Sequence, residues 1–229
     1  SDTGETSKAG DGKVTWQHAL DYIRQLNQEF YLGYNDWRLP NVIELESVFN
    51  AGIPGWLTQQ GFYELPNDYH WSSTTLASAT GRAWAGFALF EDVNSSGKSS
   101  NYYVWPVRSA QSGSFAIALP VTGQTTCYDA SGSTVSCYGS GQDGEFQRGL
   151  GWPEPRFTDN GDQTVEDNLT GLVWTKDAGT PGPAACGPGG YKNWQGALGY
   201  IECLNTNNYL GHADWRLPTR AELQSLVAY

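Results

Sequence analysis

The sequence predicts an α+β fold that is rich in loops, with short helices and small twisted antiparallel sheets. Three observations support this prediction. Two stretches have the apolar spacing of amphipathic helices, and several short runs rich in aromatic and β-branched residues alternate with turn residues. The 229 residues also include 28 Gly, while only 16% are charged. Such a composition is typical of strands and loops and not of a helical bundle.

An internal repeat organises the chain. The stretch Asp36–Leu45 (DWRLPNVIEL) returns 178 residues later as Asp214–Leu223 (DWRLPTRAEL). The alignment holds without a gap from Trp16/Trp194 to Ser47/Ser225, and 19 of these 32 positions are identical. Because chance does not give such agreement, the chain contains two copies of one module.

Each copy begins with a helix. Thr15 is the expected N-cap of the first helix, and Asn193 that of the second. The apolar positions have the spacing i, i+3, i+4, i+7 and i+10, which gives one amphipathic face. They are Trp16, Ala19, Leu20, Ile23 and Leu26 in the first copy, and Trp194, Ala197, Leu198, Ile201 and Leu204 in the second.

The repeated Trp-Arg-Leu-Pro segment leads into a second, shorter helix. Proline holds the residue before it out of the helical region, and Asn41 or Thr219 then begins a capping box with the glutamate three residues later. We expect the repeated arginine to be structural, pairing with a neighbouring carboxylate, although a ligand-binding role is the alternative. The structural motif comprises Asp36, Trp37, Arg38, Pro40, Glu44, Asp214, Trp215, Arg216, Pro218 and Glu222.

The remaining elements are predicted as strands. Three runs, 69–75, 82–90 and 102–108, would form an antiparallel meander that closes the first copy. A hairpin with an Asn160-Gly161 turn and a strand at 172–174 would open the second. The expected domains are a first module at 1–110, a linker at 111–122 and a second module at 123–229. The first lacks its opening hairpin and the second lacks its closing strands, so the chain is expected to be a slice of a longer array or a self-complementing subunit.

Charge and cysteine content restrict the partners and the compartment. The net charge is −11 without a Lys/Arg cluster, which argues against nucleic acid as a partner. No apolar run is long enough to span a bilayer. Four cysteines allow three pairings, of which the local ones, Cys127–Cys137 and Cys186–Cys203, are favoured. Disulfides imply an oxidising compartment, so we expect an extracellular location.

Four motifs are distinctive: the opening segment Phe157–Trp174, the Asp214–Pro218 turn, His70–Thr74 and Tyr102–Arg108. Together they resemble the Lcl C-terminal-like domain family of bacterial surface proteins. The resemblance covers most of the chain. It implies secreted or surface modules, often in tandem, with a C-type-lectin-like fold shared with formylglycine-generating enzymes.

The sequence favours a non-enzymatic function. Those enzymes need a cysteine pair late in their domain, and no cysteine follows His70 in the first copy, so the nucleophile is missing. We expect an adhesion or structural module whose partners are copies of itself, in a head-to-tail filament, or neighbouring modules. The alternative is a lectin-like module that binds glycans, with or without calcium, in which Trp56, Trp71 or Trp105 would stack on sugars. Other surface proteins are a further class of partner. No cofactor is expected, although Asp159, Asp162 and Asp167 carry the oxygen ligands that calcium prefers.

Overall fold

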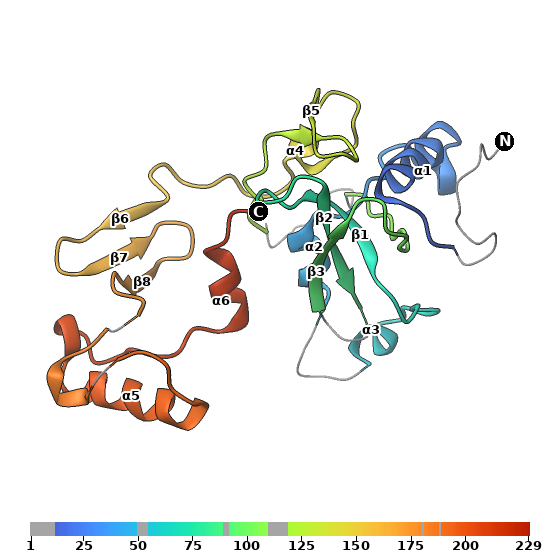
Figure 1. Cartoon of the computed structure of the whole chain (residues 1–229). Helices are drawn as coiled ribbons and strands as arrows, with labels where there is room; N and C mark the ends of the chain where they lie inside the picture. Colours follow the sequence, from blue (N-terminus) through green and yellow to red (C-terminus); the bar gives the residue numbers. More distant parts are fainter. Residues whose placement is uncertain (1–11, 50–54, 89–91, 110–118, 180, 188) are drawn as a thin grey trace. The chain divides into compact units, whose positions relative to one another are not determined.

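The computed structural model describes all residues except 1–11, 50–54, 89–91, 110–118, 180 and 188 (Figure 1). The chain forms two compact units. The first comprises Ser1–Gly151 together with the last two residues, Ala228–Tyr229, and the second comprises Trp152–Val227. Short helices and small antiparallel sheets confirm the predicted α+β class.

The first unit is built around a three-stranded antiparallel sheet of order β1-β2-β3. A two-stranded hairpin and four short helices complete its described part. The helices are α1 (Trp16–Gln28), α2 (Val42–Ser47), α3 (Trp56–Gln59) and α4 (Asp143–Phe146), with a 3₁₀ turn at Tyr31–Gly33. The strands are β1 (His70–Thr75), β2 (Arg82–Phe87), β3 (Asp92–Gly97), β4 (Cys127–Tyr128) and β5 (Thr134–Val135).

The core of the first unit lies between α1 and the sheet. The predicted face of α1 is buried throughout, and it packs with Leu39, Trp71, Ala83 and Ala85. Thr15 caps the helix as expected, with its side chain accepting the N–H of His18. The helical periodicity of the sequence therefore correctly identified the buried face.

The third strand of the sheet differs from the prediction. It is Asp92–Gly97, a run containing Ser and Asn that lies outside the three predicted strands, and all six of its residues pair with β2. The expected strand 102–108 instead forms isolated bridges, in which Tyr102 pairs with Val14 and Val107 with Arg38. Polar residues are tolerated in β3 because it lies at the sheet edge and all of its residues are exposed or half-buried.

The second unit holds an antiparallel sheet of order β6-β7-β8 and a pair of helices. The predicted hairpin turn and the strand that follows it are confirmed. The strands are β6 (Phe157–Asp159), β7 (Thr164–Asp167) and β8 (Leu172–Thr175). The helices are α5 (Trp194–Thr206) and α6 (Arg220–Ser225), with 3₁₀ turns at Ala184–Cys186 and Tyr209–Gly211.

The packing units and the expected module boundaries do not coincide. Residues 119–151, most of which were expected to open the second module, pack with the first unit. Lys98 Nζ donates to the carbonyls of Tyr128 (3.2 Å) and Asp129 (3.0 Å), and Thr74 Oγ1 donates to Asp143 (2.7 Å). These contacts join elements far apart in the sequence, which local patterns do not reveal.

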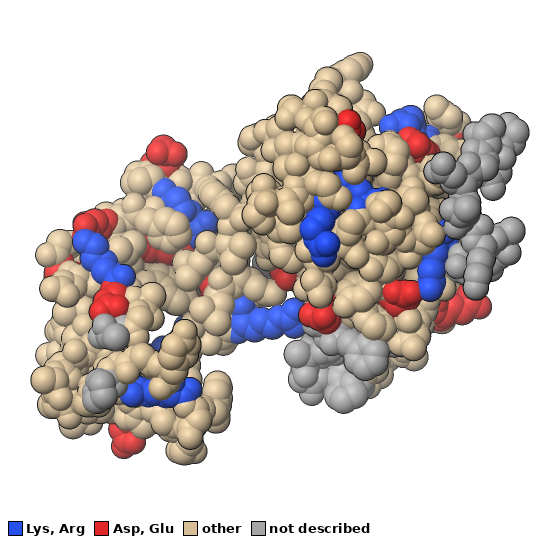
Figure 2. All heavy atoms as spheres, viewed as in Figure 1, with Lys and Arg blue, Asp and Glu red and all other residues tan. Residues whose placement is uncertain are grey.

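Both expected disulfides are present. Cys127 is bonded to Cys137 across the β4–β5 hairpin, and Cys186 to Cys203 between the 3₁₀ turn at Ala184–Cys186 and α5. On the face shown in Figure 2, the described Lys and Arg side chains occur singly or close to Asp or Glu. None of the described helices is both long and apolar enough to cross a membrane.

Candidate interaction surface

The repeated motif forms the same local structure in both copies. Arg38 makes a two-pronged ion pair with Glu44, with both N–O distances 2.6 Å, and Glu44 Oε2 also accepts the N–H of Asn41 (2.8 Å). Arg216 and Glu222 repeat this pair, and Glu222 accepts the N–H of Thr219 (2.7 Å). The arginine thus fixes the start of the short helix, as its structural interpretation predicts.

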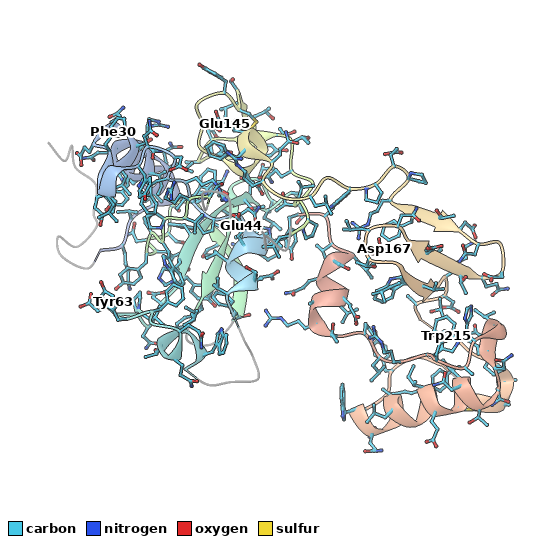
Figure 3. All side chains as sticks on the ribbon, turned by 180° about the vertical axis from the view of Figure 1, so that it is seen from behind. Phe30, Glu44, Tyr63, Glu145, Asp167 and Trp215 are labelled. Atoms are coloured by element: carbon cyan, nitrogen blue, oxygen red, sulfur yellow. A yellow bond between two sulfur atoms is a disulfide. The ribbon has the colours of Figure 1, made fainter. Side chains whose placement is uncertain are left out.

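A second set of contacts fixes the tryptophan of the motif. Asn27 accepts the N–H of Trp37 and donates to its carbonyl, both at 2.8 Å. Asn205 does the same for Trp215, at 2.7 and 2.9 Å (Figure 3). The first aspartate differs, because Asp36 pairs with Arg108 (2.9 Å), whereas Asp214 lies 4.0 Å from His212 with its side chain 91% exposed.

The two copies differ sharply in burial. Trp16 is 0% exposed and its counterpart Trp194 is 73% exposed. The same comparison gives 2% for Leu20 against 41% for Leu198. At the third identical position, the exposed fraction is 3% for Leu45 and 52% for Leu223. Identical residues at matching positions of matching helices therefore line a core in one copy and a surface in the other.

The closing strands cover this face in the first unit. Trp16 Nε1 donates to the carbonyl of Ser72 (2.8 Å), and Ser73 N–H donates to that of Pro40 (2.8 Å). Arg38 and Val107 exchange two main-chain hydrogen bonds of 2.9 Å. We call α1, α2 and the turn between them the helix unit. It contacts strand β1 and the segment after Tyr102 through both side chains and backbone.

The corresponding face of the second unit is open. Its exposed apolar side chains come from α5, α6 and the residues that follow α6; they are Trp194, Leu198, Leu223, Leu226 and Val227. We call these five residues the open face. Within the described part of this unit, Leu204 is the one hydrophobic residue that is fully buried. A unit with so small a core depends on its disulfide and its ion pairs, or on a partner.

The ligand-binding tryptophans predicted from the sequence do not come together. Trp71 is fully buried in the core and donates to the carbonyl of Val14 (2.8 Å), so it fills the core instead of presenting a surface. Trp56 lies half-buried at the start of α3. Trp105 lines a cavity, and His70 packs against it with 5.1 Å between ring centroids.

The cavity beside Trp105 has a volume of about 410 Å³ and a largely aromatic lining. Tyr63 and Phe62 contribute to it, and Tyr63 is 82% exposed (Figure 3). Burial lowers the pKa of His70 to about 4, so its imidazole is neutral at pH 7. Glu64 supplies the carboxylate of the lining.

The three aspartates proposed for calcium have separate structural partners. Asp167 accepts hydrogen bonds from Nε and Nη2 of Arg156, at 2.8 and 3.0 Å (Figure 3). Burial alone would raise the pKa of Asp167, but hydrogen bonds from Arg156 and Thr170 lower it. Asp159 pairs with Lys176, and Asp162 accepts the N–H of Thr164. Among the described residues, no three His, Cys, Asp or Glu side chains are grouped as a metal site.

Two buried charged residues were not anticipated from the sequence. Lys98 is 1% exposed and lies over the Trp16 ring at 4.0 Å, and burial lowers its pKa to about 8. Asp143 accepts hydrogen bonds from Thr74 and Thr122, and burial raises its pKa. Neither residue belongs to the repeat, because both lie outside the aligned stretches Trp16–Ser47 and Trp194–Ser225.

Comparison with known proteins supports the repeat. The model of one family, described as the Lcl C-terminal domain, matches residues 3–108 and 163–229. These two matches lie one on each copy and together cover well over half of the sequence. No curated protein and no solved structure matches the chain.

Proposed function

The chain belongs to the family of Lcl C-terminal domains, and from this premise we propose that it is a non-enzymatic structural module of a bacterial surface assembly. The family match points to a surface-associated domain, and the two disulfides are compatible with an extracellular location. The module acts by joining neighbouring modules, through the open face of its second unit.

One observation carries this proposal. The open face consists of apolar side chains on and just after two helices, and the counterparts of three of them, Trp16, Leu20 and Leu45, are buried in the first unit. Exposed apolar surface of this kind is unfavourable in water, at about 25 cal/mol per Å², and marks sites of protein–protein contact. The identical Trp and Leu residues in both copies show that this surface has the chemistry of a core.

A structural role also agrees with how the repeated polar residues are used. In both copies the arginine and the glutamate of the motif neutralise each other and cap a helix. His70 packs in an aromatic cluster, with Tyr103 and Trp105 rings beside it. We therefore assign these side chains to holding the fold, and adhesion or linkage to the surfaces of the units.

Hydroxyl-radical footprinting with mass spectrometry tests the proposal. The isolated chain and the assembled protein on the bacterial surface are labelled under the same conditions. We expect Trp194 and Leu198 to be oxidised rapidly in the isolated chain and protected in the assembly, while Trp16 is slow in both. Tyr138, which is 94% exposed on the β4–β5 hairpin, is the control for radical dose. Equal oxidation of Trp194 in both samples would refute the proposal.

Glycan binding is the second candidate, and the cavity beside Trp105 favours it. Its volume of about 410 Å³ can hold a small sugar, its aromatic rings can stack on the apolar face of a sugar ring, and Glu64 can accept hydroxyl hydrogen bonds. A glycan array with and without a calcium chelator tests this candidate, with Trp105→Ala as the paired variant. Absence of binding under both conditions would exclude it.

A further inference from the structure

We infer that the cavity beside Trp105 binds a small quaternary ammonium compound, with aromatic rings around the cation and the Glu64 carboxylate balancing its charge. The inference goes beyond the proposed function and is independent of the open face, because the described residues that line the cavity all belong to the first unit. It concerns the same cavity as the glycan candidate but names a ligand of different charge, so one experiment distinguishes the two.

The walls of the cavity include aromatic rings that meet at steep angles. The rings of Phe62 and Trp105 lie at 84° to each other, with 5.4 Å between their centroids. The His70 ring packs against Trp105 and Tyr103, with centroid distances of 5.1 and 5.8 Å. Because the face of an aromatic ring is negative, several rings around one space attract a cation. The lining thus has the composition of an aromatic cage for an organic cation.

One ring of the lining already contacts a cation. Lys13 Nζ lies 5.5 Å from the centroid of the Tyr103 ring, which is within the range of cation–π attraction. Asp68 pairs with the same ammonium group at 2.5 Å, so Lys13 adds little net positive charge. Burial lowers the pKa of His70 to about 4, so its imidazole is neutral at pH 7. Neither Lys13 nor His70 therefore opposes the entry of a cation.

Glu64 provides the negative charge. Among the described residues that line the cavity, Glu64 carries the one carboxylate, and none is a Lys or Arg. No described Lys or Arg forms an ion pair with it. Its backbone is left-handed, with φ 53°, which is unfavourable for a glutamate, and such strained residues are concentrated at ligand sites. A carboxylate without a cationic partner beside aromatic rings favours a positively charged ligand over a neutral one.

The remaining lining selects among organic cations. A primary ammonium group carries three N–H donors, which need acceptors when the group leaves water. Leu65, Pro66 and Val104 complete the cavity with apolar side chains, so acceptors are few. A quaternary ammonium group has no N–H, and its methyl groups pack against the rings. The volume of about 410 Å³ lies in the range of roughly 300–1,000 Å³ that is typical of small-molecule sites.

Titration of the full chain with choline tests the inference. The control ligand is its uncharged carbon analogue, in which a tert-butyl group replaces the trimethylammonium group. Binding is followed by NMR at the indole N–H of Trp105, which is assigned by its absence from the spectrum of Trp105→Leu. We expect choline to shift this signal to saturation and to bind about tenfold more tightly than the carbon analogue. Equal binding of the two compounds, or no saturable shift with choline, would overturn the inference.

Variants separate the charge of the cavity from its rings. Glu64→Gln should weaken choline binding about fivefold and leave binding of the carbon analogue unchanged. Glu202→Gln makes the same change at an exposed glutamate of α5 and should have no effect. Glu64→Asn keeps the test valid if the fold is sensitive, because Asn tolerates the left-handed backbone. Phe62→Leu should also weaken binding, with Tyr138→Leu as the control. Full affinity for choline in both Glu64 variants would overturn the role of the carboxylate.

Two further titrations identify the source of the ligand and separate it from a glycan. Binding to phosphatidylcholine vesicles that free choline displaces would support a lipid headgroup as the source. Binding of choline without binding to the vesicles would support a free compound. A methyl glycoside that binds more tightly than choline would overturn the inference in favour of the glycan candidate.

Discussion

The matched leucines Leu20 and Leu198 allow a direct test of the difference between the two units. They occupy the same position of the same helix, and their exposed fractions are 2% and 41%. We compare Leu20→Ala with Leu198→Ala in the full chain. The side-chain change and the helix propensity change are the same in both, so the difference in stability reports burial alone.

The expected magnitudes follow from burial. Leu20 belongs to the core cluster with Trp16 and Trp71, and truncating such a leucine costs roughly 2–5 kcal/mol, because a cavity is left. Leu198 is 41% exposed, so its truncation should cost about 0.5–1 kcal/mol. The first variant should therefore lower the melting temperature of its unit by several degrees, and the second should barely change it.

Urea unfolding followed by hydrogen exchange with mass spectrometry measures the two effects separately, since peptides from α1 and α5 report on the two units. Leu45→Ala and Leu223→Ala form an independent pair, with exposed fractions of 3% and 52%. Equal losses of stability within both pairs would refute the reasoning, since they would mean that the open face is buried in the isolated chain.

Three further predictions use the same urea assay. Glu44→Gln should destabilise the first unit by roughly 3 kcal/mol, because it leaves the buried Arg38 unpaired. Glu222→Gln should destabilise the second unit by less, because Arg216 is exposed, and equal effects of the two variants would contradict this reasoning. Stability of the first unit should fall as the pH drops from 6.5 towards 4, because His70 binds a proton in the unfolded state but stays neutral when it is buried. Stability should rise as the pH increases from about 8 to 10.5, because Lys98 has lost its proton in the folded state but keeps it in the unfolded state. His70→Phe and Lys98→Met should each flatten the curve in its own window. The double replacement Cys186→Ser and Cys203→Ser should cost the second unit roughly 3 kcal/mol, and an unchanged midpoint would show that the disulfide is dispensable.

The sequence was most informative where structure is local. The capping boxes, the apolar face of α1, both disulfides and the Asn160-Gly161 hairpin were all predicted, because each depends on residues close in the chain. Strand β3 was missed because its Ser and Asn residues pair through the backbone, which composition does not report. The packing of residues 119–151 on the first unit was missed for a related reason, since contacts such as Thr74–Asp143 span 69 residues.

The two copies separate what a local sequence determines from what its surroundings determine. Three local features differ little between the copies: the arginine–glutamate pair, the capping box and the hydrogen bonds of the asparagine to the tryptophan backbone. Burial differs strongly at three matched pairs of identical residues, Trp16/Trp194, Leu20/Leu198 and Leu45/Leu223. Local hydrogen bonds thus form the helix unit in either setting, but the removal of its apolar face from water requires strands that lie far away in the sequence.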